Sequence, residues 1–291
     1  MNKVISFFLC ITCFVANLPC FAIEENTHVL PIIGPSVEKA NEYIGKKIDL
    51  ATIKLPKKIR NFELLEADGT FTPYFVKDHT SLWTSPLRLK FRDAKWLIPA
   101  SGALTALLLT DDDFSQALTN NHHPSSTQTD ISKAFGQIGG YAPILGLPGG
   151  LIATGYFTKN DRLRETGVLQ YKAIAHASLI FLAASRIAGR NKPNNAKKGR
   201  GEFFESGTSF PSGHSANAWA IAAVASHQYP DKKWVPVIGY TLASLISTSR
   251  LLQGTHYPAD VFAGALTGYL IGKYIVKHRS NHSPNSKNSK Q

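Results

Sequence analysis

The sequence predicts an all-α protein whose main domain is a bundle of about six core helices. Three observations predict it: apolar stretches recur from residue 96 onward, turn-rich polar segments separate them, and strand patterns are nearly absent. Of the 291 residues, 43% are hydrophobic and 18% are charged, so the chain is too apolar for intrinsic disorder and long enough to bury a sizeable core.

Residues 1–22 are predicted to be a secretory signal peptide. Lys3 precedes the apolar run 4–15, and Ala22 ends the segment before two acidic residues. An uncleaved anchor helix is the alternative. All three cysteines lie within this segment, so its removal would exclude disulfide, thiol-nucleophile and cysteine-metal chemistry. We therefore expect an exported bacterial protein of the periplasm.

Residues 23–93 are expected to form a mixed, polar extension, because repeated prolines break any long element. Within it, residues 37–50 are a candidate short amphipathic helix. Residues 81–92 interleave apolar and basic side chains and are expected to be a solvated loop against the main domain; attachment to a membrane surface is the alternative. The polar, basic tail at 279–291 is expected to be disordered.

The helical domain is predicted over residues 94–278. Its core helices are expected at the apolar stretches 96–110, 134–157, 166–188, 215–226, 234–247 and 259–276. Only the second and the last approach the about 20 apolar residues that a membrane-spanning helix needs. A membrane-spanning bundle and a buried bundle attached to the membrane surface therefore both stay open.

The charge balance predicts an anionic partner. The 32 Lys and Arg residues against 20 Asp and Glu residues give a formal net charge of +12. Such a charge suits nucleic acid, a lipid headgroup surface or a phosphorylated substrate.

The first of three chemically suggestive clusters is a basic loop that begins near Ser185. Six cations precede Glu202, namely Arg186, Arg190, Lys192, Lys197, Lys198 and Arg200. By itself such a loop is either a solvated surface loop or a phosphate site.

The second cluster runs from Ser209 to Ser215 and stands before a run of small residues. Pro211, Ser212 and Gly213 are typical of a helix start, where free backbone N–H groups can hold an anion beside His214. The alternative is that His214 only caps or packs the helix.

The third cluster contains Ser249, Arg250, His256 and Asp260. A helix that begins near Pro258 would bring His256 close to Asp260. A carboxylate on Nδ1–H leaves a lone pair on Nε2, which a nucleophilic imidazole requires. A buried structural hydrogen bond is the alternative.

Small residues recur every four positions on two of the predicted helices. One face is Asp260, Gly264, Gly268 and Gly272, and the other is His214, Ala218, Ala222 and Ser226. Such faces let helices approach closely, so we expect His214 and Asp260 to meet at one end of the bundle.

Together the three clusters resemble the signature of the type 2 phosphatidic acid phosphatase superfamily, which includes bacterial acid phosphatases, lipid phosphatases and vanadium haloperoxidases. Pro211–His214 matches the family's Pro-Ser-Gly-His motif. The third cluster matches the motif Ser-Arg, five residues, His, three residues, Asp. The first motif, Lys, six residues, Arg-Pro, departs: Ser185 replaces the Lys and Lys192 replaces the Arg.

The resemblance implies a helical bundle and a role for each matching residue. His256 attacks phosphorus to form a phosphohistidine, and Asp260 orients it. His214 protonates the leaving oxygen and then activates water. Arg250, Lys192, Ser212 and the Gly213 N–H hold the phosphoryl oxygens. Arg186 and Arg190 are further candidates, because either could turn inward to compensate for the Lys that is missing at position 185.

The predicted function is therefore hydrolysis of phosphomonoesters or pyrophosphates, with lipid-linked substrates expected, on or in a membrane. We expect no metal, no cofactor and no nucleic-acid partner, because phosphoryl transfer chiefly needs positive charge around the equatorial oxygens. A vanadate-dependent haloperoxidase and a non-catalytic lipid- or phosphate-binding protein are the alternatives.

The active site is expected to face the periplasm. The stretch 96–110 is short for the hydrocarbon core and contains Pro99. The segment after it carries Asp111–Asp113 and no Lys or Arg before Lys133, which is unlike a cytoplasmic loop. We therefore expect that 96–110 does not cross the membrane.

Overall fold

A computed structural model of the chain describes residues 71–88, 90–121, 126–195 and 201–278. The expected signal peptide, the candidate helix at 37–50 and the tail at 279–291 lie outside these residues. The chain divides into two compact units, Met1–Phe71 and Thr72–Gln291. Apart from Phe71, all of the described residues belong to the second unit.

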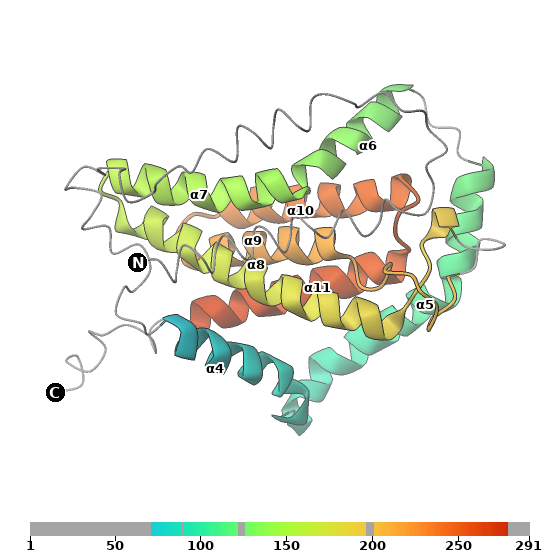
Figure 1. The fold of residues 1–291 in the computed structure, drawn as a ribbon, viewed down its shortest axis with the longest axis horizontal. Helices are drawn as coiled ribbons and strands as arrows, with labels where there is room; N and C mark the ends of the chain where they lie inside the picture. The colour runs from blue at the N-terminus through green and yellow to red at the C-terminus, as the bar shows by residue number, and fades with distance from the viewer. Residues whose placement is uncertain (1–70, 89, 122–125, 196–200, 279–291) are drawn as a thin grey trace, which may run out of the picture. The chain divides into compact units, whose positions relative to one another are not determined.

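The described residues form eight α-helices and no strand, which confirms the predicted all-α class (Figure 1). The helices are α4 (Phe71–Trp83), α5 (Ala94–Asn121), α6 (Ser126–Ile138), α7 (Tyr141–Phe157), α8 (Asp161–Ala188), α9 (Gly213–Gln228), α10 (Trp234–Leu252) and α11 (Pro258–His278). The short 3₁₀ turns are η2 (Ser85–Arg88), η3 (Phe91–Asp93) and η4 (Pro193–Asn195).

Three segments differ from the expected elements. The stretch 134–157 is divided between α6 and α7, which part at the consecutive glycines Gly139 and Gly140 because glycine is a poor helix former. Residues 81–92 are not a plain loop, since they hold the last turn of α4 and 3₁₀ turns. Helix α5 continues through Asp111–Asp113, so these acids lie inside a helix.

Helix α9 lies at the centre of the bundle and packs against α8, α10 and α11 (Figure 1). The glycine face of α11 allows the closest approach: a Cβ at Gly264 would collide with the Ser212 carbonyl, and one at Gly268 with the Ala216 carbonyl. The predicted close approach of the two helices is therefore confirmed. The partner of the glycine face, however, is the Ser212–Ala216–Ala220 face of α9.

The face of α9 that begins at His214 meets α10 instead. Ala218 and Ala222 pack there against Ala243 and Ile246. Helix α9 thus has two small-residue faces on adjacent sides. The face with Ser212, Ala216 and Ala220 packs against α11, and the face with His214, Ala218 and Ala222 packs against α10.

Helix α4 packs against the bundle through polar and aromatic contacts. His79 Nδ1 lies 3.1 Å from His176 Nδ1, and Tyr274 donates to Asp78 over 3.5 Å. Residues 72–83, which the sequence assigns to the extension, therefore belong to the same compact unit as the bundle.

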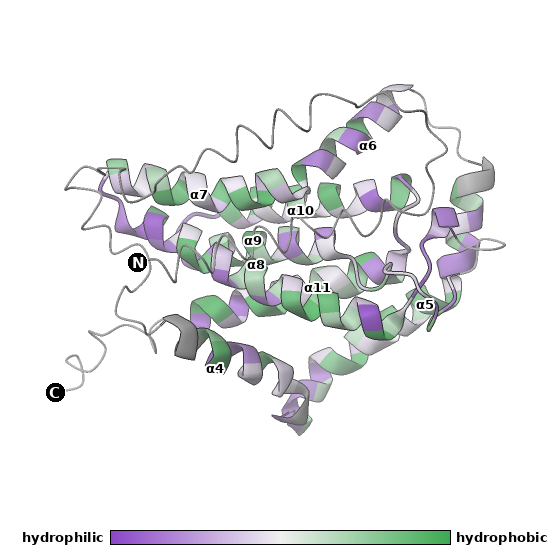
Figure 2. Ribbon diagram, in the orientation of Figure 1, coloured by the Kyte–Doolittle hydropathy of each residue, from purple (hydrophilic) through white to green (hydrophobic). Residues whose placement is uncertain are grey.

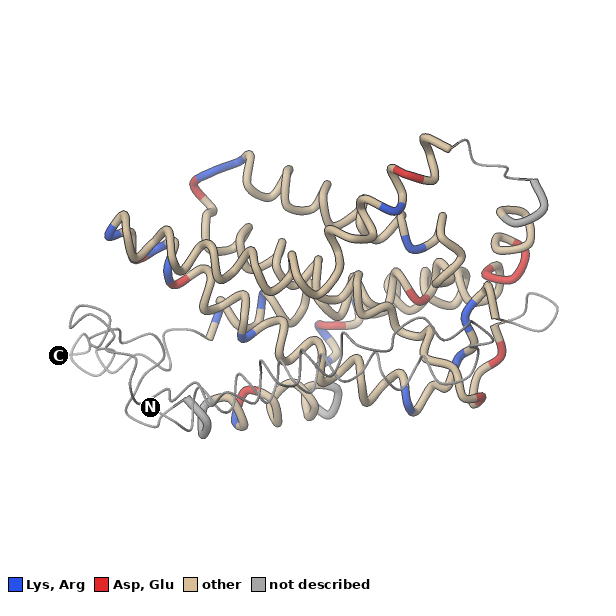
Figure 3. The backbone as a smooth tube through the Cα atoms, turned by 45° about the horizontal axis from the view of Figure 1, so that its top comes forward, with Lys and Arg blue, Asp and Glu red and all other residues tan. Residues whose placement is uncertain are grey.

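Two described segments, Asp161–Asn195 and Trp234–Leu252, are long and apolar enough to cross a membrane by length and composition alone. They are not the two stretches that the sequence favoured. Figure 2 shows the apolar character of the bundle helices, and Figure 3 shows that charged residues are sparse along the bundle. Helices α7 and α9 contain no Lys, Arg, Asp or Glu. On α10, Trp234, Val237 and Ile238 are exposed.

Candidate active site

The three motifs meet at one end of the bundle, where α8 and α10 end and α9 and α11 begin (Figure 1). The Ser212 backbone N–H donates to the Asp260 carbonyl over 2.9 Å and thereby ties the starts of α9 and α11 together. The prediction that these helix ends come together is confirmed by this contact.

His256 is held by a backbone carbonyl and not directly by the carboxylate. Its Nδ1 lies 2.8 Å from the Ser209 carbonyl oxygen and 3.7 Å from Asp260 Oδ2. A carbonyl can only accept, so Nδ1 carries the proton, and in the neutral imidazole the lone pair is therefore on Nε2. The tautomer is therefore the one expected, although the group that selects it differs.

Asp260 is fully buried and accepts hydrogen bonds on both oxygens. Oδ2 accepts from Ser209 Oγ at 2.5 Å and from the Tyr257 N–H at 2.9 Å, while Oδ1 accepts from Arg190 Nη1 at 2.6 Å. Burial alone would raise the pKa of Asp260, but His256, Arg190 and Ser209 together lower it below its ordinary value. The carboxylate is thus kept ionised beside the imidazole.

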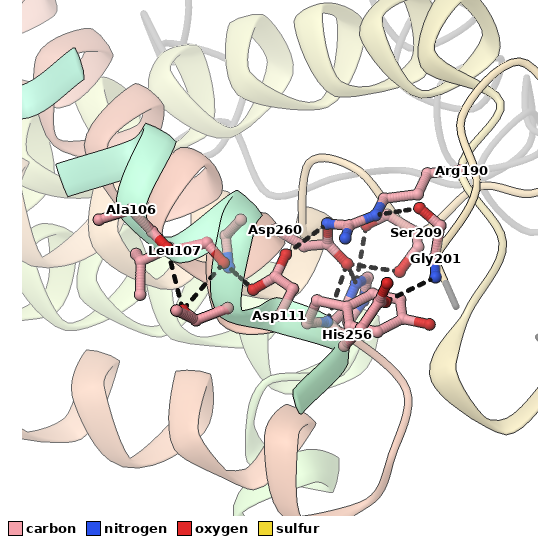
Figure 4. Close-up of polar contacts among 12 residues, drawn as sticks. Ala106, Leu107, Asp111, Arg190, Gly201, Ser209, His256 and Asp260 are labelled. Atoms are coloured by element: carbon pink, nitrogen blue, oxygen red, sulfur yellow. Dashed lines mark hydrogen bonds and ion pairs between the residues drawn. The ribbon is translucent and has the colours of Figure 1, made fainter. Parts of the chain in front are cut away.

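Arg190 is committed to this carboxylate and does not turn toward a phosphate (Figure 4). Its Nη1 lies 2.8 Å from Asp111 Oδ2 as well, and its Nε donates to the Gly201 carbonyl over 3.1 Å. The guanidinium lies 4.8 Å and 4.1 Å from the ring centres of Phe203 and Tyr257, and Arg190 is only 2% exposed. The predicted compensation by Arg190 does not match this geometry.

Asp111 and Asp112 of α5 are site residues that the sequence did not identify. Asp111 is fully buried and accepts from the Ala259 N–H over 3.0 Å, and Asp112 accepts from the Gly201 N–H over 3.0 Å. Burial raises the pKa of Asp111, opposed by the hydrogen bonds from Ala259 and Arg190. The sequence feature that could have identified them is the run of acidic residues directly after the apolar stretch 96–110.

Arg250 and Lys192 place positive charge around His214. Burial, followed by the positive charge of Arg250, lowers the pKa of His214 to about 3, and Lys192 adds to the effect. Burial and neighbouring positive charge thus both disfavour protonation of His214, and the same positive charge would attract an anion.

Ser212 and Gly213 supply the helix start that the motif predicted. Ser212 is the N-cap of α9, and its hydroxyl accepts from the Ser215 N–H over 3.4 Å. Gly213 is the first residue of α9, so its N–H has no partner further back in that helix. Such helix starts favour bound anions.

The structure shows where the residues that depart from the first motif lie. Ser185 is buried on α8 and donates its hydroxyl proton to the Leu182 carbonyl of its own helix. Arg186 is exposed, whereas Lys192 is partly buried in the loop after α8. Of the cations expected to compensate for the missing Lys, neither Arg186 nor Arg190 lies free beside the site.

Helix α6 forms a wall of the site that the sequence did not predict. Arg250 Nη2 donates to Gln253 Oε1 over 2.7 Å, and Gln253 Nε2 donates to the Ser132 carbonyl over 2.6 Å. A Cβ at Gly136 would collide with the Arg250 guanidinium, and one at Gly139 would lie 3.4 Å from the His214 ring. The apolar pattern did not predict this contact, because it favours a single helix over residues 134–157 instead of the separate helices α6 and α7.

Comparison with known proteins identifies similar sequences among phosphatases. Residues 165–283 match the family model of the PAP2 superfamily. The chain is 38% identical over 84 residues to the lipid A 1-phosphatase of Porphyromonas gingivalis, a match covering 28% of this chain and 19% of that protein. It is 37% identical over 81 residues to phosphatidylglycerophosphatase B of Bacillus subtilis, covering 25% and 39%. The chain spans less than half the length of these curated relatives.

Among solved structures, the fold resembles the transmembrane PAP2-type phosphatidylglycerolphosphate phosphatase of Bacillus subtilis. The TM-score is 0.49 at 22% identity, and the match covers 64% of this chain and 97% of that one. The part of the chain that matches the family model contains all three motifs, from Ser185 to Asp260. This part of the chain, residues 165–283, is therefore similar to the PAP2 superfamily.

Proposed function

We propose that the protein is a phosphatase that hydrolyses lipid-linked phosphomonoesters or pyrophosphates through a phosphohistidine, without a metal ion. One observation carries the proposal: His256 Nδ1 is bound to the Ser209 carbonyl, which leaves Nε2 as the nucleophilic nitrogen, at the bundle end where Arg250, Lys192 and His214 gather. A nucleophile beside preorganised positive charge is what phosphoryl transfer needs.

In the first step His256 Nε2 attacks phosphorus, and the bond from phosphorus to the leaving oxygen breaks. His214 donates a proton to that oxygen. In the second step water attacks the phosphohistidine, His214 takes the proton back from the water, and phosphate leaves. Arg250, Lys192 and the N–H groups at the start of α9 stabilise the charge on the phosphoryl oxygens.

His214 must gain a proton before it can act as an acid. Burial and the neighbouring cations hold the pKa of His214 at about 3. A bound phosphate dianion would offset the charge of those cations, so its arrival favours protonated His214. Substrate binding and proton uptake are therefore coupled.

Support for a lipid substrate and a membrane location comes from the relatives and from the helices. The relatives named above are phosphatases of lipid A and of phosphatidylglycerophosphate. Two helical segments are long and apolar enough to cross a membrane. We place the active site on the periplasmic side, because the predicted signal peptide would export the chain.

Phosphate release from phosphatidic acid, phosphatidylglycerophosphate, undecaprenyl pyrophosphate and a soluble chromogenic ester tests the proposal. His256→Ala should abolish turnover, since it removes the covalent path. His214→Ala should slow it by ~10²–10⁴-fold, the usual contribution of a general acid–base. Vanadate should compete with substrate, and a chelator should have no effect.

Substantial turnover by folded His256→Ala protein would overturn the mechanism. Activity lost on chelation and restored by a divalent ion would overturn metal independence. Vanadate-dependent halide oxidation in place of phosphate release would identify a haloperoxidase. Phosphate or lipid binding without any turnover would identify a binding protein.

A further inference from the structure

Arg250 is buried in the last turn of α10 with part of its guanidinium unpaired. The residue is only 9% exposed, and neither its Nε nor its Nη1 has a hydrogen-bond partner among the residues that the structure describes. A buried donor on a charged group is costly to leave unpaired, so its presence calls for a ligand or another functional reason. In the proposed mechanism that ligand is the phosphoryl group.

Two hydrogen bonds in series hold the remaining nitrogen of this guanidinium. Arg250 Nη2 donates to Gln253 Oε1 over 2.7 Å, and Gln253 Nε2 donates to the Ser132 carbonyl over 2.6 Å. The Ser132 carbonyl can only accept, so Gln253 must turn its Nε2 toward α6 and its Oε1 toward Arg250. The amide of Gln253 therefore connects the guanidinium to the backbone of α6 in one defined orientation.

The backbone of α6 also restricts the space beside the guanidinium. A Cβ at Gly136 would collide with Arg250 Nη2 and would lie 2.6 Å from Gln253 Nε2. Ser132 is itself fixed, because it is buried and its hydroxyl donates to the Ser249 carbonyl over 3.3 Å. Gln253 and α6 thus hold Nη2 in one place and leave Nε and Nη1 unpaired.

We propose that Gln253 is a positioning residue for phosphoryl transfer, which together with α6 fixes the Arg250 guanidinium in the orientation that stabilises the transition state. The inference rests on the proposed phosphatase function and adds to it a residue from the unspecified spacer of the third motif. Donors that are already oriented need no reorganisation when charge develops on the phosphoryl oxygens. The contribution of Gln253 should therefore be larger in the transition state than in the ground state.

The first test uses full-length Gln253→Met protein, in which the side chain keeps its length but loses both polar atoms. We expect kcat/KM to fall about tenfold, mostly through kcat. The inhibition constant of vanadate, which can adopt the five-coordinate geometry of the transition state, should rise by a similar factor, whereas that of inorganic phosphate should rise less than about threefold. Gln137→Met is the matched control, because Gln137 is an exposed glutamine on the same α6, and it should behave like wild type.

The second test displaces the same groups from the side of α6 with Gly136→Ala. The added methyl group would meet the ends of two flexible side chains, so the helices need not separate, and alanine is the better helix former. The melting temperature should therefore not fall, while kcat/KM should fall about tenfold. Gly146→Ala is the control, since Gly146 is exposed on α7 and a Cβ there would meet nothing within 4 Å. It should leave turnover unchanged.

Three outcomes would overturn the inference while leaving the phosphatase proposal intact. They are wild-type kinetics in Gln253→Met, an equal weakening of vanadate and phosphate binding, and a loss of activity that accompanies a lower melting temperature in both variants. The last two would indicate that Gln253 only supports the local structure. A wild-type protein that releases no phosphate from any substrate would instead count against the phosphatase function itself.

Discussion

At the scale of single residues, the buried group around Arg190 explains how the charge of Asp260 is kept. Arg190 lies within 2.6 Å of Asp260 and 2.8 Å of Asp111, and all three side chains are almost completely buried. A lone arginine would neutralise the carboxylate that stands 3.7 Å from His256. With both carboxylates ionised, the three groups keep one net negative charge, which favours the positive charge that the His256 imidazole gains as it attacks phosphorus.

We therefore expect Asp111→Asn to lower kcat about tenfold, equivalent to about 1.4 kcal/mol of transition-state stabilisation, and to leave KM unchanged. Arg190 would then balance Asp260 alone, while no substrate contact is lost. Steady-state kinetics measure the effect, and the exposed neighbour change Asp113→Asn is the matched control. A fall of equal size in Asp113→Asn, or a rise in KM without a change in kcat, would contradict the charge-balance role of Asp111.

The pKa of His214 predicts acid sensitivity of the fold. This pKa is about 3 in the folded protein against 6.5 ordinarily, so between these values the unfolded chain binds a proton that the folded chain does not. The free energy of unfolding therefore falls as the pH drops from 6.5 toward 3.

Thermal melting between about pH 4.5 and pH 7 should show this loss of stability, and His214→Asn should show a shallower pH dependence. Bound vanadate should reduce the loss in the wild type, because an anion favours protonated His214. An identical pH dependence in His214→Asn would show that other groups control acid unfolding.

At the scale of elements, the glycine face of α11 sets its distance from α9 and hence brings Asp260 and Ser212 together. A Cβ at Gly268 would collide with the Ala216 backbone carbonyl, which cannot move aside as a side chain could. By contrast, Gly150 on α7 is exposed, and a Cβ added there would meet nothing within 4 Å.

We expect Gly268→Ala to destabilise the protein by about 1–3 kcal/mol and to lower activity, because the two helices must separate. Gly150→Ala should leave stability unchanged or raise it by up to about 1 kcal/mol, since alanine is the better helix former. Melting temperatures of the two variants decide the point. Equal destabilisation by both would indicate a general intolerance of alanine in these helices.

At the scale of the whole molecule, the alternation of α7 to α11 places every motif at one end of the bundle. Helices α8 and α10 run toward that end, and α9 and α11 start from it (Figure 1). Asp111 and Asp112 bring the later part of α5 to the same end through Ala259 and Gly201. Positions 120 and 195 should therefore share one side of the membrane.

Cysteine labelling in whole cells can test the periplasmic placement, after replacement of the native Cys10, Cys13 and Cys20. Single cysteines at Asn120 and Asn195 should react with a reagent that does not cross the inner membrane. A cysteine at Lys232 should be protected if the helices span, and should react if the bundle is peripheral. Protection at both Asn120 and Asn195 would place the active site in the cytoplasm.

The sequence by itself determined the helical class, most helix positions and the end of the bundle where the motifs meet. These features depend on local patterns: apolar periodicity, helix-start residues such as Pro258, and spacings such as the three residues between His256 and Asp260. Glycines at every fourth position of α11 likewise indicated close helix packing before any contact was known.

Only the tertiary structure decided which partners the reactive groups have. Ser209 and His256 are 47 positions apart in the chain and form a hydrogen bond. Asp111 of α5 forms an ion pair with Arg190, which lies just after the end of α8. Helix α6 reaches Arg250 and His214 through glycines, which carry no side-chain chemistry that a motif could report. Spacing along the chain specifies neighbours within one helix, but contacts between helices depend on how their faces pack, and that is settled only when the whole bundle assembles.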